Sequence, residues 1–587
     1  MPGSRSRAPI PSREEEALWC FGGFSGESSA LRPKDSRLLW SDTPNIWVSG
    51  QTSDSDVRCT RHGDRRIAVF GPNSVPDGEL IRLGVEGVPD DAAWKWPGSY
   101  VVIEISSTGT SIWTDLCSAQ PVYTLPVDRG TLWASSSRLL ASLNGMHLDL
   151  DHLIHRLVAS GSSLQAADRS YFADVSLVPA AHRFSLDTAG RSTTRPLWHP
   201  RFHTENHARR LRGALEEAVA LRVDKAKVPS TDFSGGFDST GLGLLAAERL
   251  HPERVIIGVT VHPAGVVEGG DIDYAREAAS HPGIRHEWMA LGCQHSPYQG
   301  ISSVTPSDEP APSTVAYAAL SAQFQWMRDR FGCDHHMTGD GGDSLLTTPV
   351  TIVNDLLGSG RLPRAVAEVF RWARLRQTSA WQAWRSARGN REAPDTPGWL
   401  TGDALERLNS LPDGVPDRFG GDSTALKAVL NSMSEIGRSA RSESQLAEPF
   451  GIQLHNPYTD SAVVNSYLSI HPKRLPSPSH YKPVMAEAMR DLFPDRLLRR
   501  TTKGDASSDH YRGIRNALPE IHELMDGALS DLGLVKPDSL RHSVSRAAAG
   551  TTTHLSSIKN AVSTEIWVRA LRAAPPVAWI ASEKEIR

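Results

Sequence analysis

The pattern of hydrophobic and polar positions changes near residue 196. Before that point, short runs rich in β-branched and aromatic residues alternate with turns that contain Gly or Asp, which is typical of antiparallel sheets. The clearest runs are Tyr100–Ile105, Ser111–Thr114, Val122–Leu125 and Thr131–Ala134. We therefore predict a β-rich N-terminal domain over residues 17–195, after a disordered lead-in over residues 1–16.

After residue 196, apolar strands alternate with helical segments. The predicted helices cover residues 204–226, 239–250, 271–280 and 313–331, and the predicted strands are Thr231–Ser234, Val255–Val261, Arg285–Leu291 and His335–Thr338. Strands that alternate with helices form right-handed βαβ units around a parallel sheet. Such sheets bind ligands at the carboxyl ends of their strands. We expect an α/β domain over residues 196–587 with its site at that edge.

An arginine- and tryptophan-rich stretch over residues 359–425 breaks this alternation. Its characteristic residues are Arg361, Arg364, Arg371, Arg374, Arg376, Arg385, Arg388 and Arg391, interleaved with Trp372, Trp381 and Trp384. One interpretation is a solvated helical insertion. The other is a surface that holds an acidic or peptidic partner.

Composition argues against several classes of protein. The 587 residues carry a formal net charge of −4 with a pI of about 6.6, whereas a general nucleic-acid coat would be strongly basic. Five cysteines without a CxxC pair argue against a disulfide framework and a structural zinc site. No apolar run is long enough for a signal peptide core or a membrane span. We expect a cytoplasmic protein without nucleic-acid or membrane partners.

The strongest chemical signal is the run Ser234-Gly235-Gly236-Phe237-Asp238-Ser239-Thr240, between a predicted strand and a predicted helix. The two glycines allow a tight turn and a close approach of the backbone to a ligand. The amides of the turn and of the helix N-terminus then point at one position, which suits an anion such as pyrophosphate. The hydroxyls of Ser239 and Thr240 add donors.

Two weaker motifs have simpler explanations. Gly241–Ala246 matches a dinucleotide fingerprint, but its glycines fall inside the predicted helix, so helix packing explains them and a NAD site does not. The histidine pairs His203/His207 and His152/His155, and His335-His336, have neither a third ligand nor an HExxH motif. We assign them core or surface roles.

A second constellation, Thr338-Gly339-Asp340-Gly341-Gly342-Asp343, follows another predicted parallel strand. It therefore lies at the same edge of the sheet as the first turn. Carboxylates in a glycine-rich turn hold Mg²⁺ through oxygen ligands, with phosphates completing the coordination shell. We predict that Asp238 and Asp343 share one Mg²⁺ ion.

These motifs resemble the synthetase domain of the asparagine synthetase family, a group of PP-loop ATP pyrophosphatases. The glycine turn resembles the family's SGGxDS, and the acidic turn its SGEGxDE, with Asp340 in place of Glu and Ser344 where a second acid is usual. Further matching segments, in the family's order, are Asp273–Arg276 (D-x-A-R), His286-Glu287 (H-x-E), Asn456–Asp460 (PFLD) and Arg500–Gly504 (R-x-K).

The N-terminal part resembles the class II glutaminase domain, an Ntn-type αββα fold. The matching landmarks are Trp96–Tyr100, Thr114-Asp115, Pro121–Tyr123 and Ala134–Ser136. Such a glutaminase needs cysteine as its mature first residue, because the α-amine of that cysteine serves as base. Here Met1 is followed by Pro2, and Cys20 lies inside an apolar run. We read Cys20 as a buried strand residue, so that glutamine-derived ammonia is not the nucleophile.

A family member that keeps the ATP chemistry and loses the glutaminase must use another amine. Lasso-peptide cyclases activate an Asp or Glu side chain of a ribosomal peptide, and the peptide's own N-terminal amine closes a macrolactam. β-Lactam synthetases close a small amino-acid ring, and a Tyr, working with a distant Glu, usually stands at the position of Asp340. The acidic Asp340 favours a cyclase. The alternatives are a β-lactam synthetase-like ligase, a glutamine-independent asparagine synthetase homologue, or an inactive peptide-binding scaffold.

The resemblance also implies roles for individual residues. With ATP and Mg²⁺ as cofactors, Lys503 stabilises charge on the α-phosphate and pyrophosphate, and Asp340 either acts as base or orients its neighbours. Residues implied in nucleotide binding are Phe233, Ser234, Gly235, Gly236, Asp238, Ser239, Thr240, Val259, Arg276, Thr338 and Gly339. Lasso cyclases as a group work with a leader peptidase and a precursor-recognition protein, which are the partners that the resemblance implies.

Overall fold

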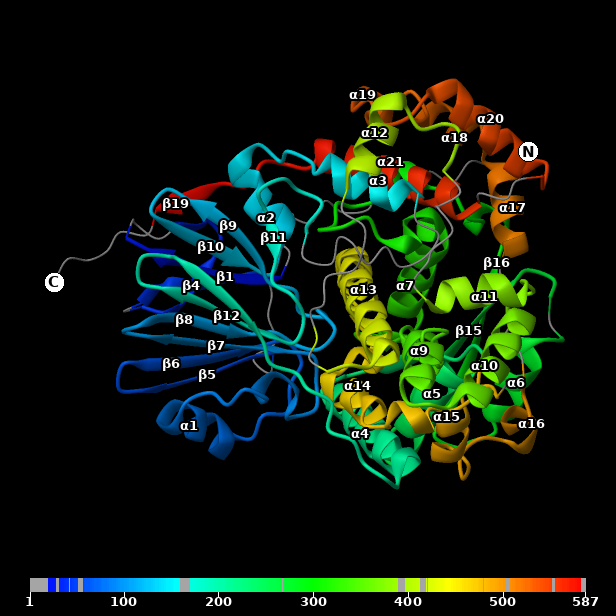
Figure 1. The fold of residues 1–587 in the computed structure, drawn as a ribbon, viewed down its shortest axis with the longest axis horizontal. Coiled ribbons are helices and arrows are strands. Elements are labelled where there is room, and N and C mark those ends of the chain that lie inside the picture. Colours follow the sequence, from blue (N-terminus) through cyan, green and yellow to red (C-terminus); the bar gives the residue numbers. More distant parts are fainter. Residues whose placement is uncertain are drawn as a thin grey trace.

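The computed structural model describes residues 19–27, 31–41, 43–50, 56–158, 169–266, 268–388, 396–411, 419, 421–478, 480–501, 507–551 and 555–581. Figure 1 shows a β-rich half, drawn in blue and cyan, beside a larger half of helices around a parallel sheet. The predicted lead-in over residues 1–16 lies outside the described residues.

The β-rich half is built from two six-stranded antiparallel sheets. The first has the order β11-β9-β10-β1-β4-β3 and the second β13-β12-β8-β7-β6-β5. The strands of the first sheet are β1 (Cys20–Gly26), β3 (Arg37–Trp40), β4 (Thr43–Ser49), β9 (Tyr123–Val127), β10 (Gly130–Ala134) and β11 (Ser176–Leu177). The strands of the second are β5 (Val57–His62), β6 (Arg65–Phe70), β7 (Val101–Ser106), β8 (Gly109–Trp113), β12 (His182–Asp187) and β13 (Ser192–Pro196).

These two sheets share an apolar core. Phe21 and Val48 of the first sheet and Val101 and Ile103 of the second belong to one buried cluster. Because side chains alternate between the two faces of a strand, the intervening Val102 lies in a different cluster on the outer face. Both faces of β7 are therefore buried, each in its own apolar cluster.

The larger half contains a five-stranded sheet of order β16-β15-β14-β17-β18 in which all neighbours are parallel. Its strands are β14 (Pro229–Asp232), β15 (Ile256–Pro263), β16 (Ile284–Leu291), β17 (His335–Met337) and β18 (Gln453–His455). Residues 256–260 are all buried, as expected for a parallel strand that is covered by helices on both faces.

The helices fall into three groups along the chain. The β-rich half carries α1 (Asp77–Glu86), α2 (Ser137–Ala141) and α3 (Leu150–Val158). Around the parallel sheet lie α4 (His207–Val223), α5 (Phe237–Leu250), α6 (Asp271–Ala278), α7 (Tyr317–Phe331), α8 (Gly342–Leu346), α9 (Ile352–Gly358), α10 (Leu362–Leu375), α11 (Ala380–Ala387), α13 (Thr424–Ala447), α14 (Ser461–Leu468), α15 (Pro483–Ala488) and α16 (Asp495–Leu498). In contrast, α12 (Gly402–Ser410) packs against α3 and shares a buried cluster with the C-terminal helices. The last group is α17 (Ser507–Asn516), α18 (Leu518–Leu524), α19 (Ala528–Asp531), α20 (Pro537–Ala548) and α21 (Leu555–Ala573).

The C-terminal helices return to the β-rich half. Phe24 and Leu132 of the first sheet belong to the same buried cluster as Ile521 and Trp567 of α18 and α21. After α21, strand β19 (Trp579–Ala581) pairs with β2 (Leu31–Pro33). The two halves therefore share a core, and this core contains residues from both sides of the boundary predicted at residue 196.

The mixed α/β character and the parallel sheet are confirmed, with small changes of boundary. Strand β14 ends at Asp232, so Phe233 and Ser234 belong to the turn rather than to the predicted strand. The helix predicted over residues 313–331 starts at Tyr317 after a 3₁₀ turn, and it ends at Gly332, whose φ of 72° is the left-handed conformation that glycine adopts readily. Gly241 and Gly243 lie inside α5.

Candidate active site

Two turns lie next to each other at the carboxyl edge of the parallel sheet. The first follows β14 and the second follows β17, and these strands are direct neighbours in the sheet. The turns begin the helices α5 and α8. The structure therefore brings together the two constellations that the sequence places more than a hundred residues apart.

The first turn is shaped by hydrogen bonds and by its glycines. The Ser239 hydroxyl lies 2.9 Å from the Ser234 hydroxyl and accepts from the Ser234 amide at 3.2 Å. Gly235 has a φ of 80°, and a Cβ there would lie 2.1 Å from the Asp271 carbonyl oxygen. Arg500 donates to the Gly235 carbonyl at 2.9 Å and pairs with Asp271. The turn therefore needs glycine and is held from the side by a buried arginine.

The second turn presses directly on the first. A Cβ at Gly342 would lie 2.4 Å from Cγ of Asp238, and one at Gly339 would lie 2.7 Å from the Ser239 amide nitrogen. Neither position has room for a side chain. The glycines of the acidic turn thus allow Asp238 and Asp343 to approach one position.

Lys482 connects the two carboxylates. Its ammonium contacts the Asp238 carboxylate and lies 2.6 Å from Oδ1 of Asp343. The Lys482 side chain is 1% exposed, whereas that of Asp343 is 48% exposed, so the group opens to solvent on the Asp343 side. A cation already stands between these acids, and two carboxylates are oxygen donors of the kind that Mg²⁺ takes. The donor set fits the predicted metal.

The segment Asn456–Asp460 braces both turns. The Asn456 side chain donates to the Thr338 hydroxyl at 2.8 Å, and the Tyr458 hydroxyl donates to the Asp238 carbonyl at 3.2 Å. Asp460 pairs with Arg222 of α4 and accepts from Ser99 at 2.8 Å. This segment therefore fixes the site and joins it to the β-rich half.

Asp340 faces a second group of acids. Its carboxylate accepts from the Thr338 hydroxyl at 3.1 Å. Glu443, on α13, is a nearby carboxyl that the sequence had not indicated. Burial raises the pKa of Glu443 from 4.5 to about 8, and the charges of Asp340 and Asp232 add to the rise. The raised pKa favours the protonated form of Glu443, which lies near Asp340, the candidate base.

The residues implied in nucleotide binding differ in how far their side chains are exposed. The side chains of Phe233, Thr240 and Val259 are buried, with exposed fractions of at most 1%, so they offer mainly backbone to a ligand. Arg276 lies on α6, pairs with Asp273 at 3.3 Å and stacks over the Trp288 ring. Lys503 lies outside the described residues, and its implied role stays a prediction.

Cys20 lies buried in a β-strand, as expected for a structural residue. It is 4% exposed within β1, and burial raises the pKa of its thiol to about 12. The preceding Trp19 packs against Phe21, and Arg441 stacks over the Trp19 ring and donates to its carbonyl at 2.6 Å. Trp19 is thus part of the fold.

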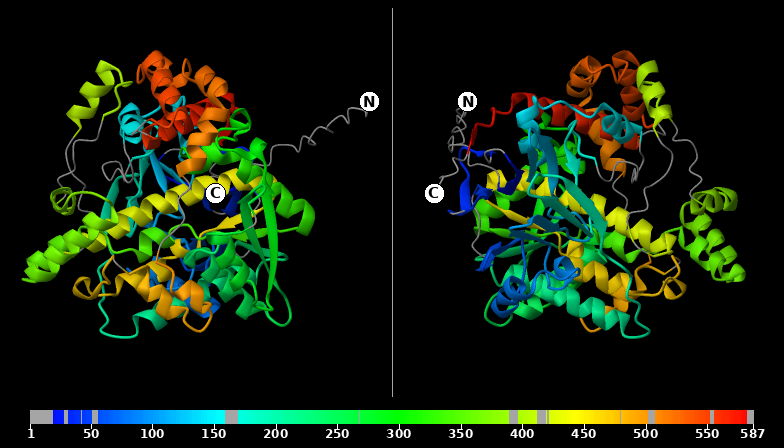
Figure 2. Two further views of the ribbon diagram at one scale, coloured as in Figure 1. Left: turned by 90° about the vertical axis from the view of Figure 1, so that its right-hand side faces the viewer. Right: turned by 60° about the vertical axis from the view of Figure 1, so that its left-hand side comes forward.

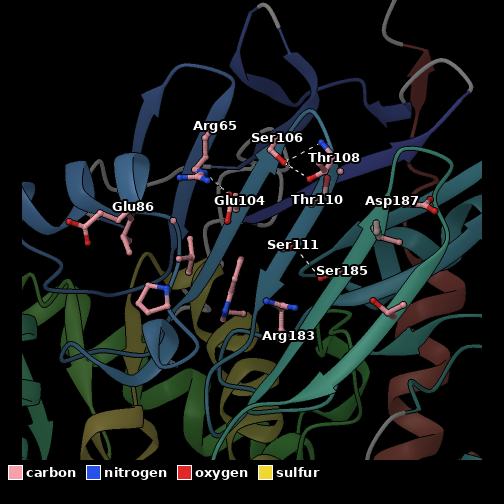
Figure 3. A pocket seen from close by; sticks show the side chains of 18 of the residues that line it. Arg65, Glu86, Glu104, Ser106, Thr108, Thr110, Ser111, Arg183, Ser185 and Asp187 are labelled. Carbon is pink, nitrogen blue, oxygen red and sulfur yellow. Dashed lines mark hydrogen bonds and ion pairs between the residues drawn. The ribbon is translucent and has the colours of Figure 1, made fainter.

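The β-rich half carries a groove of about 950 Å³ on the outer face of its second sheet. Figure 3 shows that charged and hydroxyl side chains line it. Arg65 pairs with Glu104 at 2.7 Å, and the hydroxyls of Ser111 and Ser185 lie 3.0 Å apart. None of the residues predicted for the site lines this groove, so it is separate from the two turns.

Two further observations concern the whole chain. In the described ranges, no group of three or more His, Cys, Asp or Glu side chains is arranged to hold a metal ion. Among the helices that the structure describes, none is both long and apolar enough to cross a bilayer.

Comparison with known proteins gives one family match. The family model described as asparagine synthase matches residues 210–569. No match was found among curated proteins. Among solved structures, glutamine phosphoribosylpyrophosphate amidotransferase from B. subtilis is similar at 10% identity over 56% of this chain and 92% of that chain, with a TM-score of 0.21. A structure described as the allosteric regulatory enzyme of purine biosynthesis is similar at 11% identity over 46% of this chain and 59% of that chain, with a TM-score of 0.19.

Proposed function

Because the chain belongs to the asparagine synthase family, and is therefore an ATP-dependent carbon–nitrogen ligase, we propose that it closes macrolactams on ribosomal peptides. In this proposal it adenylates an Asp or Glu side chain of the peptide, and the peptide's N-terminal amine displaces AMP. The observation that carries the proposal is the meeting of Asp238 and Asp343 at one cation position at the sheet edge.

The activation step makes use of the first turn. A substrate carboxylate oxygen attacks the α-phosphorus of ATP, the bond between the α-phosphorus and its bridging oxygen breaks, and pyrophosphate leaves. The amides at Gly235 and the start of α5 would offer donors to that leaving group, while the Gly236 amide donates to the Ser234 hydroxyl at 3.3 Å. Asp238 and Asp343 would hold Mg²⁺, which when bound neutralises charge on the phosphates. Lys482, which contacts both carboxylates, supplies a fixed positive charge beside them.

The amide-forming step requires a proton to leave the attacking amine. The amine nitrogen bonds to the acyl carbon, the bond from that carbon to the AMP oxygen breaks, and the amine proton passes to a base. An α-amine has a reference pKa of about 7.7–8.0, so much of it is neutral near pH 8. Asp340 is the candidate base, and the raised pKa of the nearby Glu443 disfavours a second negative charge next to it.

The amine donor is the part of the proposal that separates it from an amidotransferase. A class II glutaminase uses an N-terminal cysteine with a free α-amine, but Cys20 is buried, follows an ordered Trp19 and has a raised thiol pKa. These observations support an amine that arrives on the substrate itself. A peptide whose N-terminus attacks its own side chain meets that requirement, and a leader peptidase and a precursor-recognition protein would deliver it.

One assay tests the proposal. The protein is incubated with ATP, Mg²⁺ and a panel of synthetic peptides that carry a free N-terminus and one Asp or Glu at successive positions. We expect AMP and pyrophosphate, with a peptide that has lost one water and has no free N-terminal amine. ADP as the product contradicts the mechanism. AMP formation only with small amino acids contradicts the peptide substrate and favours the β-lactam synthetase-like alternative.

A further inference from the structure

The helical hairpin formed by α10 and α11 exposes an unusual amount of apolar surface. Figure 2 shows these helices, in light green, projecting from the rest of the molecule. The exposed apolar side chains on the hairpin and its connection are Leu362, Val366, Phe370, Leu375 and Trp381. Phe370 is 61% and Trp381 67% exposed, although burying an aromatic side chain of this size is worth several kcal/mol. Such a surface marks an interaction site more often than chance.

Three of these side chains form one row on α10. Leu362, Val366 and Phe370 are spaced at i, i+4 and i+8, which places them along one ridge of the helix. The ridge borders the face that packs on the body, where Val369 and Ala373 are buried. An exposed ridge of this spacing has the geometry with which one helix packs on another.

The charge on the hairpin is mainly positive. Residues 359–388 contain seven arginines, no lysine and one acid, Glu368. Glu368 is buried, lies 2.8 Å from Arg371 and accepts from Ser477 at 3.0 Å. Arg374 is exposed, and in the described part of the chain no carboxylate lies within ion-pair distance of it. The ridge is thus flanked by positive charge in a protein whose formal net charge is −4.

We propose that the α10–α11 hairpin is a docking surface for an acidic amphipathic helix of a peptide or protein partner. Apolar side chains of that helix pack against the row Leu362, Val366 and Phe370, and its carboxylates pair with exposed arginines such as Arg374. Arg361 and Arg364 instead donate to the carbonyls of Lys473 and Leu475, and these bonds hold the hairpin on the body. Arginine suits this partner because its planar guanidinium binds a carboxylate through two hydrogen bonds. The inference does not depend on the reaction that the protein catalyses.

Two other occupants fit the observations less well. A second copy of this chain would bring arginines against arginines, because a symmetric contact pairs a patch with itself. An anionic membrane needs its apolar contacts in one plane, but Leu375 lies about 140° around the helix from Leu362 at 100° per residue. The row Leu362, Val366 and Phe370, flanked by arginines, is complementary to a partner helix that has apolar residues on one face and acidic residues beside them.

The test uses the full chain and two synthetic peptides. Each peptide has about 18 residues, long enough to populate a helix, with Leu at i and i+4 spacing and either Glu or Lys at the other positions. Binding is measured by fluorescence anisotropy at low and high salt. The hairpin variants are V366S/F370S, which removes the row, and Arg374→Glu. The control variant is I81S/V85S, which changes two apolar residues on α1 that are also exposed and have the same i, i+4 spacing.

We expect the Glu peptide to bind more tightly than the Lys peptide and to lose affinity at high salt. Both hairpin variants should weaken this binding by at least about tenfold, and the control variant should bind like the parent. Equal binding of the two peptides, or unchanged binding by V366S/F370S, overturns the proposal. Two other results also overturn it: a dimer that V366S/F370S dissociates, and binding to phosphatidylglycerol vesicles that the same variant abolishes.

Discussion

At the scale of single residues, Lys482 neutralises part of the negative charge of the two carboxylates in the site. Its buried ammonium stands between Asp238 and Asp343. Without it, two carboxylates at one position repel each other, and a fixed positive charge near the leaving pyrophosphate is lost. Removing one preorganised charge of this kind costs about 100- to 1,000-fold in turnover.

We therefore expect Lys482→Met to lower ATP-dependent pyrophosphate release about 100-fold or more. Lys95→Met is the control, because Lys95 pairs with Glu79 on the surface of the β-rich half. Far-ultraviolet circular dichroism of each variant checks that it is folded. Turnover of the Lys482 variant within a factor of two or so of the parent contradicts the role.

Glu443 gives a second residue-scale prediction, on stability. Its pKa is 4.5 ordinarily and about 8 in the folded protein, so between these values the folded state holds a proton that the unfolded state releases. Stability due to Glu443 is therefore fully present below pH 4.5 and is lost as pH rises toward 8. Glu443→Gln carries no such charge. We expect the variant to gain melting temperature over the parent at about pH 9 but not at about pH 5. An equal difference at both pH values contradicts the raised pKa.

At the scale of elements, the site depends on two strand–turn–helix units that touch. Gly342 begins α8 and lies against Asp238. An added methyl group at this position must displace a carboxylate that is held by Lys482, since the Cβ would lie 2.4 Å from Cγ of Asp238. A Cβ added at Gly358, at the end of α9, would meet no atom within 4 Å, so this glycine offers a matched comparison.

We expect Gly342→Ala to lower pyrophosphate release at least about tenfold and to destabilise the protein by about 1–3 kcal/mol, as overpacking does. Gly358→Ala should leave turnover unchanged and alter stability by less than about 0.5 kcal/mol. Urea unfolding and the pyrophosphate assay measure both effects. If the two variants behave alike, the close contact between the turns after β14 and β17 is not needed for activity.

The sequence predicts those features of the site that depend on a short contiguous segment of the chain. The glycine turn and the acidic turn each combine a strand, a specific run and a helix start, and parallel strands meet at one edge. Lys482 has no such signal, because Tyr481-Lys482-Pro483 resembles any short turn and only the tertiary fold brings it to Asp238. Glu443 could not be predicted for the same reason. It lies in the last third of α13, where the spacing of apolar residues indicates helix packing and gives no sign of a functional carboxyl group. The pairing of β19 with β2 depends on a contact between the two ends of the described chain, which no local pattern expresses.

At the scale of the whole molecule, the two halves are joined by buried polar contacts as well as by a shared core. Glu309 accepts from the Tyr123 hydroxyl of β9 at 2.7 Å and pairs with Arg438 of α13 at 2.8 Å. The side chains of Arg438 and Glu309 are 8% and 10% exposed. A charge pair in this setting is costly to break, because the remaining charge stays buried without compensation.

We expect Arg438→Met to destabilise the protein by about 3–5 kcal/mol, because it leaves the Glu309 carboxylate at the interface without its cation. Since strand residues of the first sheet and helix residues of α18 and α21 lie in one cluster, the loss should lower a single thermal transition rather than release one half first. Differential scanning calorimetry measures the transition, and Arg249→Met, which breaks an exposed pair with Asp224, should shift it little. A separate low-temperature transition in the Arg438 variant would mean that the halves unfold independently, and a small shift would mean that water reaches Glu309.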